Sequence, residues 1–150
     1  MDEKKPKLLL VCEHVYPDDL GNAPVTAFGL SQRMAGLGYD VTLASANPGD
    51  LPEEEAAGSV RLIRYNVERE SKINYYLSLI KGMDKLMARL IKEEEPFDLI
   101  HFFHHISALG ARLNGKLKKY KKLFTHFGSM SLEYLVRDIG RDKGAGYREK

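Results

Sequence analysis

Short apolar runs alternate with longer amphipathic stretches along most of the chain. Continuous runs of about five apolar residues are typical of parallel strands that are buried on both faces. The stretches between them carry apolar residues at intervals of three and four, which predicts helices. Five strands are expected to begin near Lys7, Val41, Val60, Asp98 and Lys122. The alternation predicts a Rossmann-like α/β domain, a three-layer α/β/α arrangement around a doubly wound parallel sheet of about five strands.

Three helices are predicted between these strands. Their expected limits, in chain order, are Pro24 to Gly36, Ser71 to Glu95 and Ile106 to Leu117. The acidic, turn-rich segment from Asn47 to Glu55 is expected to be a solvated loop. Ser131 to Val136 favours one or two helical turns, and the tail from about residue 137 lacks apolar periodicity and is expected to be mobile. The whole chain is therefore predicted to form a single domain.

The expected topology brings particular polar residues together. In a sheet of order 3-2-1-4-5, the first and fourth strands are neighbours, and ligands bind beyond the carboxyl ends of the strands at this switch point. Cys12, Glu13 and His14 follow the first strand, His101 lies near the end of the fourth, and His126 lies one strand further on. A neutral imidazole there can accept the proton of a hydroxyl group near pH 7.

Several short segments, in this order, resemble a known family. They are Tyr16 to Asp18, Gly21, Leu37 to Thr42, Pro96 to His101 and Phe124 to Gly128. Together they are similar to the N-terminal domain of family 4 glycosyltransferases, which have the two-domain GT-B fold. The resemblance extends over roughly residues 7 to 136. It implies an acceptor-side domain of an enzyme that transfers a sugar from a nucleotide sugar to a hydroxyl group of a small-molecule or lipid-linked acceptor.

The resemblance and the topology together give candidate site residues. His101 and His126 are the catalytic candidates, and the substrate-binding candidates are Gly21, Asn22, Glu13, His14, His104 and Gly128. Asn22 replaces the second glycine of the family's loop. In the family the histidine directly precedes a glycine, whereas here Phe127 lies between His126 and the glycine. His126 would then point to the other face of the sheet if the strand continued regularly. His101 could equally be a structural histidine, and Gly21 with Asn22 a plain helix-entry turn.

Two further patterns have simpler explanations. His101, His104 and His105 could bind a metal, but no carboxylate or cysteine follows at ligand spacing, so no metal or other cofactor is predicted. A run of five lysines could attract anionic lipid head groups at about 1 kcal/mol each, or could simply be a solvated helix end. These are Lys116, Lys118, Lys119, Lys121 and Lys122.

Composition and charge limit the remaining choices. The chain of 150 residues is 43% hydrophobic and 29% charged, which is ordinary for a globular domain. Its net charge of +2 gives no indication of a nucleic-acid partner. Cys12 is the only cysteine, and no apolar run approaches the ~20 residues that span a bilayer. We therefore expect a cytoplasmic protein, with contact to the membrane surface as an option.

The residues that would bind the donor are not found. The family's second domain contributes two glutamates separated by seven residues, and no glutamate pair here has that spacing. There is also no Asp-x-Asp, the metal-nucleotide motif of the other major glycosyltransferase fold. The expectation is an acceptor-side domain, incomplete on its own, with the nucleotide sugar held by a second domain or subunit. A non-catalytic interaction module and a small nucleotide- or phosphate-binding Rossmann-like protein are the alternatives.

Overall fold

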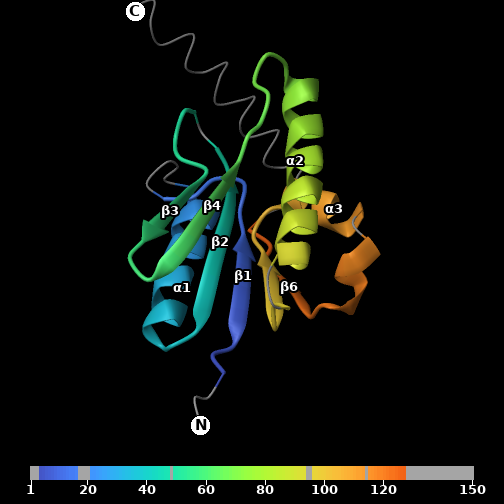
Figure 1. Cartoon of the computed structure of the whole chain (residues 1–150). Coiled ribbons are helices and arrows are strands. Elements are labelled where there is room, and N and C mark those ends of the chain that lie inside the picture. The colour runs from blue at the N-terminus through green and yellow to red at the C-terminus, as the bar shows by residue number, and fades with distance from the viewer. Residues whose placement is uncertain (1–3, 17–20, 48, 94–95, 114, 128–150) are drawn as a thin grey trace, which may run out of the picture.

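The computed structural model describes residues 4–16, 21–47, 49–93, 96–113 and 115–127. Strands and helices alternate along the described residues (Figure 1). The elements are β1 (Lys7–Val11), α1 (Asn22–Gly36), β2 (Asp40–Ala46), β3 (Glu54–Ala57), β4 (Val60–Tyr65), α2 (Lys72–Glu93), β5 (Leu99–Phe102), α3 (His105–Leu113), the 3₁₀ helix η1 (Gly115–Lys119) and β6 (Lys122–Phe124). The helical turns expected from Ser131 to Val136 and the tail lie outside the described residues.

The strands form one sheet in the order β3-β4-β2-β1-β5-β6. All neighbouring pairs are parallel except β3 and β4. The five predicted strands and their order are thus confirmed. The chain runs outward from β1 through β2 to β4 and then returns to β5 on the other side of β1, so the topological switch point lies between β1 and β5.

The segment expected to be an acidic loop contains a strand instead. Glu54–Ala57 form β3, which pairs antiparallel with β4 after a turn in which Gly58 adopts a φ of +64°. The carboxylates are held by arginines of β4, because Arg64 Nη2 lies 2.6 Å from Glu55 Oε1 and Arg61 Nη2 lies 3.1 Å from Glu54 Oε2. β3 therefore protects the edge of the parallel sheet.

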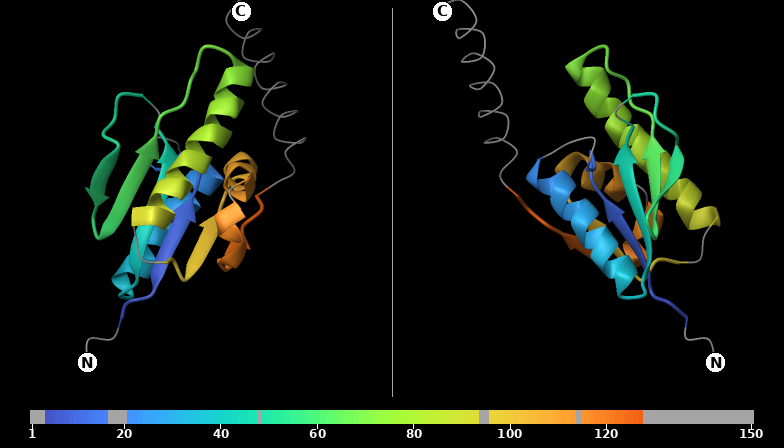
Figure 2. Two further views of the ribbon diagram at one scale, coloured as in Figure 1. Left: turned by 45° about the vertical axis from the view of Figure 1, so that its right-hand side comes forward. Right: turned by 90° about the vertical axis from the view of Figure 1, so that its left-hand side faces the viewer.

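Helices cover both faces of the sheet, as predicted. Figure 2 shows α1 on one face, with α2 and α3 on the other. In β1, Leu8 and Leu10 pack in the core beneath α1, whereas Leu9 and Val11 pack in the core beneath α2 and α3. This alternation decides which face each side chain beyond the strands will reach.

α2 and α3 approach each other unusually closely. A Cβ added to Gly110 of α3 would lie 2.7 Å from the backbone oxygen of Ile80 in α2. The third helix is shorter than expected, since it ends at Leu113, and Leu117 reaches the same core from η1. The close approach matters for the site at the switch point. One of its side chains comes from α2, and another comes from the residue that precedes α3.

We predict that Gly110→Ala lowers the free energy of unfolding by about 1–3 kcal/mol, because the neighbouring atom is backbone and cannot turn aside. Gly29→Ala, inside α1, is the matched control. Nothing lies within 4 Å of its added Cβ, so it should stabilise the chain by up to about 1 kcal/mol. Urea unfolding measures both changes, and equal effects of the two variants would contradict the close α2–α3 packing.

Candidate functional site

A buried carboxylate organises the switch point. Glu13 follows β1 by two residues, and its side chain is 10% exposed. Tyr75 donates its hydroxyl hydrogen to Glu13 Oε1 over 2.5 Å, and His104 Nε2 lies 2.6 Å from Oε2. His14 Nε2 lies 3.1 Å from the Tyr75 hydroxyl and 3.5 Å from Glu13 Oε1. Four polar side chains therefore form one contiguous cluster, called here the Glu13 cluster.

Three separate elements position these residues. Phe103 donates a backbone hydrogen bond to Val11 over 2.8 Å, which extends the pairing of β1 with β5 towards His104. Ala46 donates to the carbonyl of Glu13 over 2.8 Å and anchors that residue to the end of β2. By the alternation along the strands, Glu13 and His104 both reach the face covered by α2. The first turn of α2, which rises beyond the end of β1 in Figure 1, adds Tyr75.

The start of α2 is itself fixed by local hydrogen bonds. Ser71 precedes the helix, and its hydroxyl oxygen accepts from the backbone N–H of Asn74 over 3.2 Å. The carbonyl of Ser71 accepts from the N–H of Tyr75 over 2.9 Å. Ser71 is thus the N-cap that holds Tyr75 in place.

The surroundings of Glu13 keep it ionised. Burial by itself would raise the pKa of the carboxyl group, but the hydrogen bonds from His104, His14 and Tyr75 outweigh burial and hold the pKa well below its usual 4.5. Burial and the nearby Glu13 charge raise the pKa of Tyr75, so the phenol stays protonated and remains a donor. The cluster therefore contains a fixed negative charge at neutral pH.

This charge also fixes the histidine tautomers. A carboxylate only accepts hydrogen bonds, so His104 must carry a hydrogen on Nε2. Tyr75 gives its single hydrogen to Glu13, so His14 must donate from Nε2 as well. In the neutral imidazoles Nδ1 then keeps its lone pair, and within the described residues His104 Nδ1 is buried without a hydrogen-bond partner. His14, whose side chain is 24% exposed, is therefore the candidate acceptor for a hydroxyl hydrogen, and His104 supports the ionised Glu13.

His101 lies on the other face of the sheet. His101 belongs to β5 and pairs with Leu10 of β1, and its side chain is buried with Nε2 2.7 Å from the Thr125 hydroxyl. Its ring stacks on Phe103 with 4.0 Å between the ring centroids. Burial lowers the pKa of His101, which keeps it neutral near pH 7. The strands that carry His101 and precede Glu13 are neighbours, as predicted. The histidine that contacts Glu13 is nevertheless His104, because it lies an odd number of residues from His101 and therefore reaches the opposite face of the sheet.

The structure does not bring His126 to His101. The exposed His126 packs against His105, with 5.1 Å between their ring centroids, and against Phe124. Phe124 pairs with Phe102, whose side chain lies beneath α2 and α3, and by strand alternation His126 shares that face whereas His101 lies on the other; the shared cleft of His101 and His126 stays a prediction. The physical reason for this difference in face is again strand alternation, because side chains of consecutive residues point to opposite faces. His126 therefore points away from the face on which Thr125 contacts His101.

The glycine loop is described only at its end. Gly21 is the N-cap of α1 with φ −65°, and Asn22 is the first residue of the helix. No described residue other than glycine has a positive φ, so Asn22 does not replace a glycine conformation. Gly128 lies outside the described residues.

One lysine of the lysine run makes hydrogen bonds within the fold. Lys122 Nζ donates to the carbonyls of Leu117 and Tyr120 over 2.7 and 2.8 Å, so it fastens the end of η1. Lys118, Lys119 and Lys121 are exposed. In the part of the chain that the structure describes, no helix is long and apolar enough to cross a membrane. Contact of the remaining lysines with a membrane surface stays a prediction.

Sequence reasoning missed Tyr75. Its place in an apolar helical stripe suggests packing, and only the position in the first turn after a strand, facing the switch point, could have indicated a polar role.

A metal is not indicated by the geometry, since the described residues contain no group of three or more His, Cys, Asp or Glu side chains arranged to hold an ion.

An α/β domain with a polar cluster at its switch point is a common ligand-binding arrangement. Comparison with known proteins shows which family of such proteins this chain resembles. The profile of Glycosyltransferase Family 4 matches residues 23–145. The chain therefore belongs to glycosyltransferase family 4, as its motifs suggested. No curated protein matches it in sequence.

A solved structure agrees with this assignment. Sucrose-phosphate synthase from Thermosynechococcus elongatus, a GT-B glycosyltransferase, superposes with a TM-score of 0.68 at 15% sequence identity. At this identity the likeness shows the fold alone. The match covers 87% of this chain and 35% of the synthase, so the chain spans about a third of the length of that enzyme.

We predict that Tyr75→Phe lowers the free energy of unfolding by about 1.5–3 kcal/mol, the usual contribution of a hydrogen bond to a charged group. Tyr39→Phe, which removes a phenol outside the Glu13 cluster, should change it by less than about 0.5 kcal/mol. Urea unfolding at pH 7 tests both variants. A Tyr75→Phe chain as stable as the unmodified one would show that the hydroxyl does not hold Glu13.

Proposed function

We propose that this chain is the acceptor-side domain of a glycosyltransferase that moves a sugar from a nucleotide sugar to an acceptor hydroxyl. The observation that carries the proposal is the convergence of Glu13, Tyr75, His14 and His104 at the switch point of a family 4 glycosyltransferase domain. Ligands of doubly wound sheets bind at this place. The alternatives, an interaction module and a nucleotide-binding protein, do not call for an ionised carboxylate that orients two imidazoles.

The cluster suits the activation of a hydroxyl group. Glu13 orients each imidazole through its Nε2–H, which leaves Nδ1 as the acceptor atom. His104 Nδ1 is buried, so His14 Nδ1 accepts the hydrogen of the acceptor hydroxyl. The acceptor oxygen then forms a bond to the anomeric carbon of the donor sugar, and the bond between that carbon and the nucleotide diphosphate breaks. The proton goes to the imidazole, whose positive charge the Glu13 carboxylate stabilises.

His101 has a different part in this proposal. Its side chain is buried between Phe103 and the Thr125 hydroxyl, so it positions the end of β5, from which His104 follows. We therefore assign His14 to the acceptor hydroxyl and both His104 and His101 to positioning. His126, which lies beside His105, has no part in the proton transfer.

The donor is held elsewhere. The chain carries neither the paired glutamates of the family's second domain nor an Asp-x-Asp. Sugar transfer then needs a second domain or subunit that closes over the carboxyl ends of the strands, excludes water and brings the anomeric carbon into reach of the acceptor. The nucleotide sugar and the acceptor are the small-molecule partners of the complete enzyme.

We predict that the isolated chain transfers no sugar and that transfer appears when the domain carrying the paired glutamates is added. In that complex, Glu13→Gln should lower kcat by about 10²-fold or more, because the imidazoles lose the charge that orients them. Glu70→Gln, an exposed carboxylate outside the cluster, is the matched control and should have no effect. His101→Ala should lower kcat less than Glu13→Gln does.

Transfer is followed with a radiolabelled nucleotide sugar, and circular dichroism checks that each variant is folded. Robust transfer by the isolated chain would overturn the division of roles. An unchanged kcat for folded Glu13→Gln in the complex would overturn the assignment of the cluster.

A further inference from the structure

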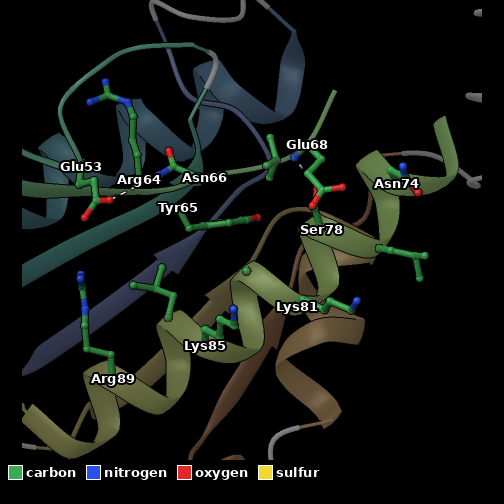
Figure 3. Close-up of a pocket in the computed structure, with 14 residues that line it drawn as sticks. Glu53, Arg64, Tyr65, Asn66, Glu68, Asn74, Ser78, Lys81, Lys85 and Arg89 are labelled. Atoms are coloured by element: carbon green, nitrogen blue, oxygen red, sulfur yellow. Dashed lines mark hydrogen bonds between the residues drawn. The ribbon is translucent and has the colours of Figure 1, made fainter. Parts of the chain in front are cut away.

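A groove separate from the Glu13 cluster runs between the end of β4 and the outer side of α2 (Figure 3). Its volume is about 550 Å³, within the range of small-molecule sites. Polar residues that line it come from both walls and include Glu53, Asn66, Glu68, Asn74, Lys81 and Lys85. The groove is therefore large enough for a ligand and is lined by groups that can orient one.

Both hydrogen-bond donors and acceptors are left available in the groove. Within the described part of the chain, the ammonium groups of Lys81 and Lys85, the carboxylate of Glu68 and the side-chain amide of Asn74 make no hydrogen bond or ion pair. Two of these groups only donate, one only accepts, and the amide does both. A ligand that fits must consequently donate as well as accept.

The two arginines of the groove do not change this balance. Arg89 Nη2 is held by Glu54 Oε1 over 3.1 Å. Arg64 turns its guanidinium away from α2, as Figure 3 shows, and binds Glu55. An inorganic anion would be repelled by the Glu68 and Glu53 carboxylates, whereas neutral hydroxyl groups can pair with all of these side chains.

Apolar atoms form the floor between the two polar walls. Leu77 and Leu86 of α2 and the ring of Tyr65 line it. Tyr65 lies tightly on the helix, because a Cβ on Gly82 would come within 2.5 Å of its Cδ2. Apolar strips with polar groups on either side suit a saccharide, whose C–H faces are apolar and whose edges carry hydroxyls.

The groove is next to the Glu13 cluster. Tyr65 lines the groove with its ring, and its side chain belongs to the buried core beneath α2. On α2, Asn74 lines the groove and the adjacent Tyr75 binds Glu13. One end of the groove therefore lies close to the cluster along α2.

We propose that the groove between β4 and α2 binds the further sugar residues of an oligosaccharide acceptor, whose reacting hydroxyl lies at the Glu13 cluster. This inference rests on the proposed function and names its substrate class as a neutral, polyhydroxylated chain longer than a monosaccharide. The contacts that would recognise it are the carboxylate of Glu68, the amide of Asn74 and the ammonium groups of Lys81 and Lys85.

The test is an NMR titration of the ¹⁵N-labelled full chain with neutral tetrasaccharides of glucose, mannose, galactose and N-acetylglucosamine, each compared with its monosaccharide and with inorganic phosphate. At least one tetrasaccharide should shift the amide signals of the groove and bind more tightly than its monosaccharide. In Glu68→Ala/Lys81→Ala its Kd should rise about tenfold, as expected for the loss of one or two hydrogen bonds. Glu70→Ala/Lys92→Ala removes the same charges outside the groove and should leave Kd unchanged.

Three results would overturn the inference. They are the absence of groove shifts with every tetrasaccharide, a Kd that the groove variant does not change, and binding of phosphate at Lys81 and Lys85 that is tighter than that of any tetrasaccharide. Because the titration needs no donor, it is read independently of sugar transfer. Tetrasaccharide binding without transfer in the complete enzyme would contradict the catalytic proposal alone, and transfer without groove binding would contradict the groove alone.

Discussion

The ionised carboxylate of Glu13 is the interaction on which the site depends. A buried charge is costly unless it is hydrogen-bonded, and Glu13 is satisfied by groups from the β5–α3 connection, from α2 and from its own loop. These contacts tie the end of β1 to elements that are distant in sequence. Removing a single partner would leave a buried charge short of a donor, so position and chemistry are linked in this cluster.

Helix α2 connects the two proposed binding regions. Its N-cap Ser71 sets the first turn, which directs Tyr75 to Glu13. The following turns form one wall of the groove, with Lys81 and Lys85 on it. The helix is held against the domain by the close contact of Gly110 with Ile80 and of Gly82 with Tyr65. A shift of α2 would therefore alter the cluster and the groove together. Both lie on the same side of the sheet, and α2 borders each of them.

The sequence was sufficient for the parallel core of the fold. Uninterrupted apolar runs can only be buried strands here, and the helical stripes between them impose the doubly wound order. β3 escaped prediction because Glu54 and Glu55 look solvated until the arginines of β4 are known to face them. Its pairing depends on contacts across a turn at Gly58, which no local pattern in the acidic segment reveals.

The candidate site could be located from the sequence, but its members could not all be chosen. Glu13, His14 and His104 were among the candidates, whereas Tyr75 was hidden in an apolar helical stripe. The choice between His101 and His104 depends on where β5 stops alternating. His101 still belongs to the strand and points beneath the α1 side, and His104 lies past its end on the α2 side. A shift of one residue in the end of a strand reverses the face of the sheet that each following side chain reaches. A sequence pattern does not define the end of an element to within one residue.

The most direct test is to follow the side-chain carboxyl carbon of Glu13 by ¹³C NMR as the pH is lowered from 7. With its pKa held well below the usual 4.5, Glu13 should keep the chemical shift of an ionised carboxylate as the pH falls below 4.5. In the folded state it binds a proton less readily than in the unfolded state, so its contribution to stability is present above about pH 4.5 and is lost as the pH falls further. A Glu13 carboxyl that titrates at or above 4.5 in the folded chain would contradict the hydrogen-bonded cluster and the role built on it.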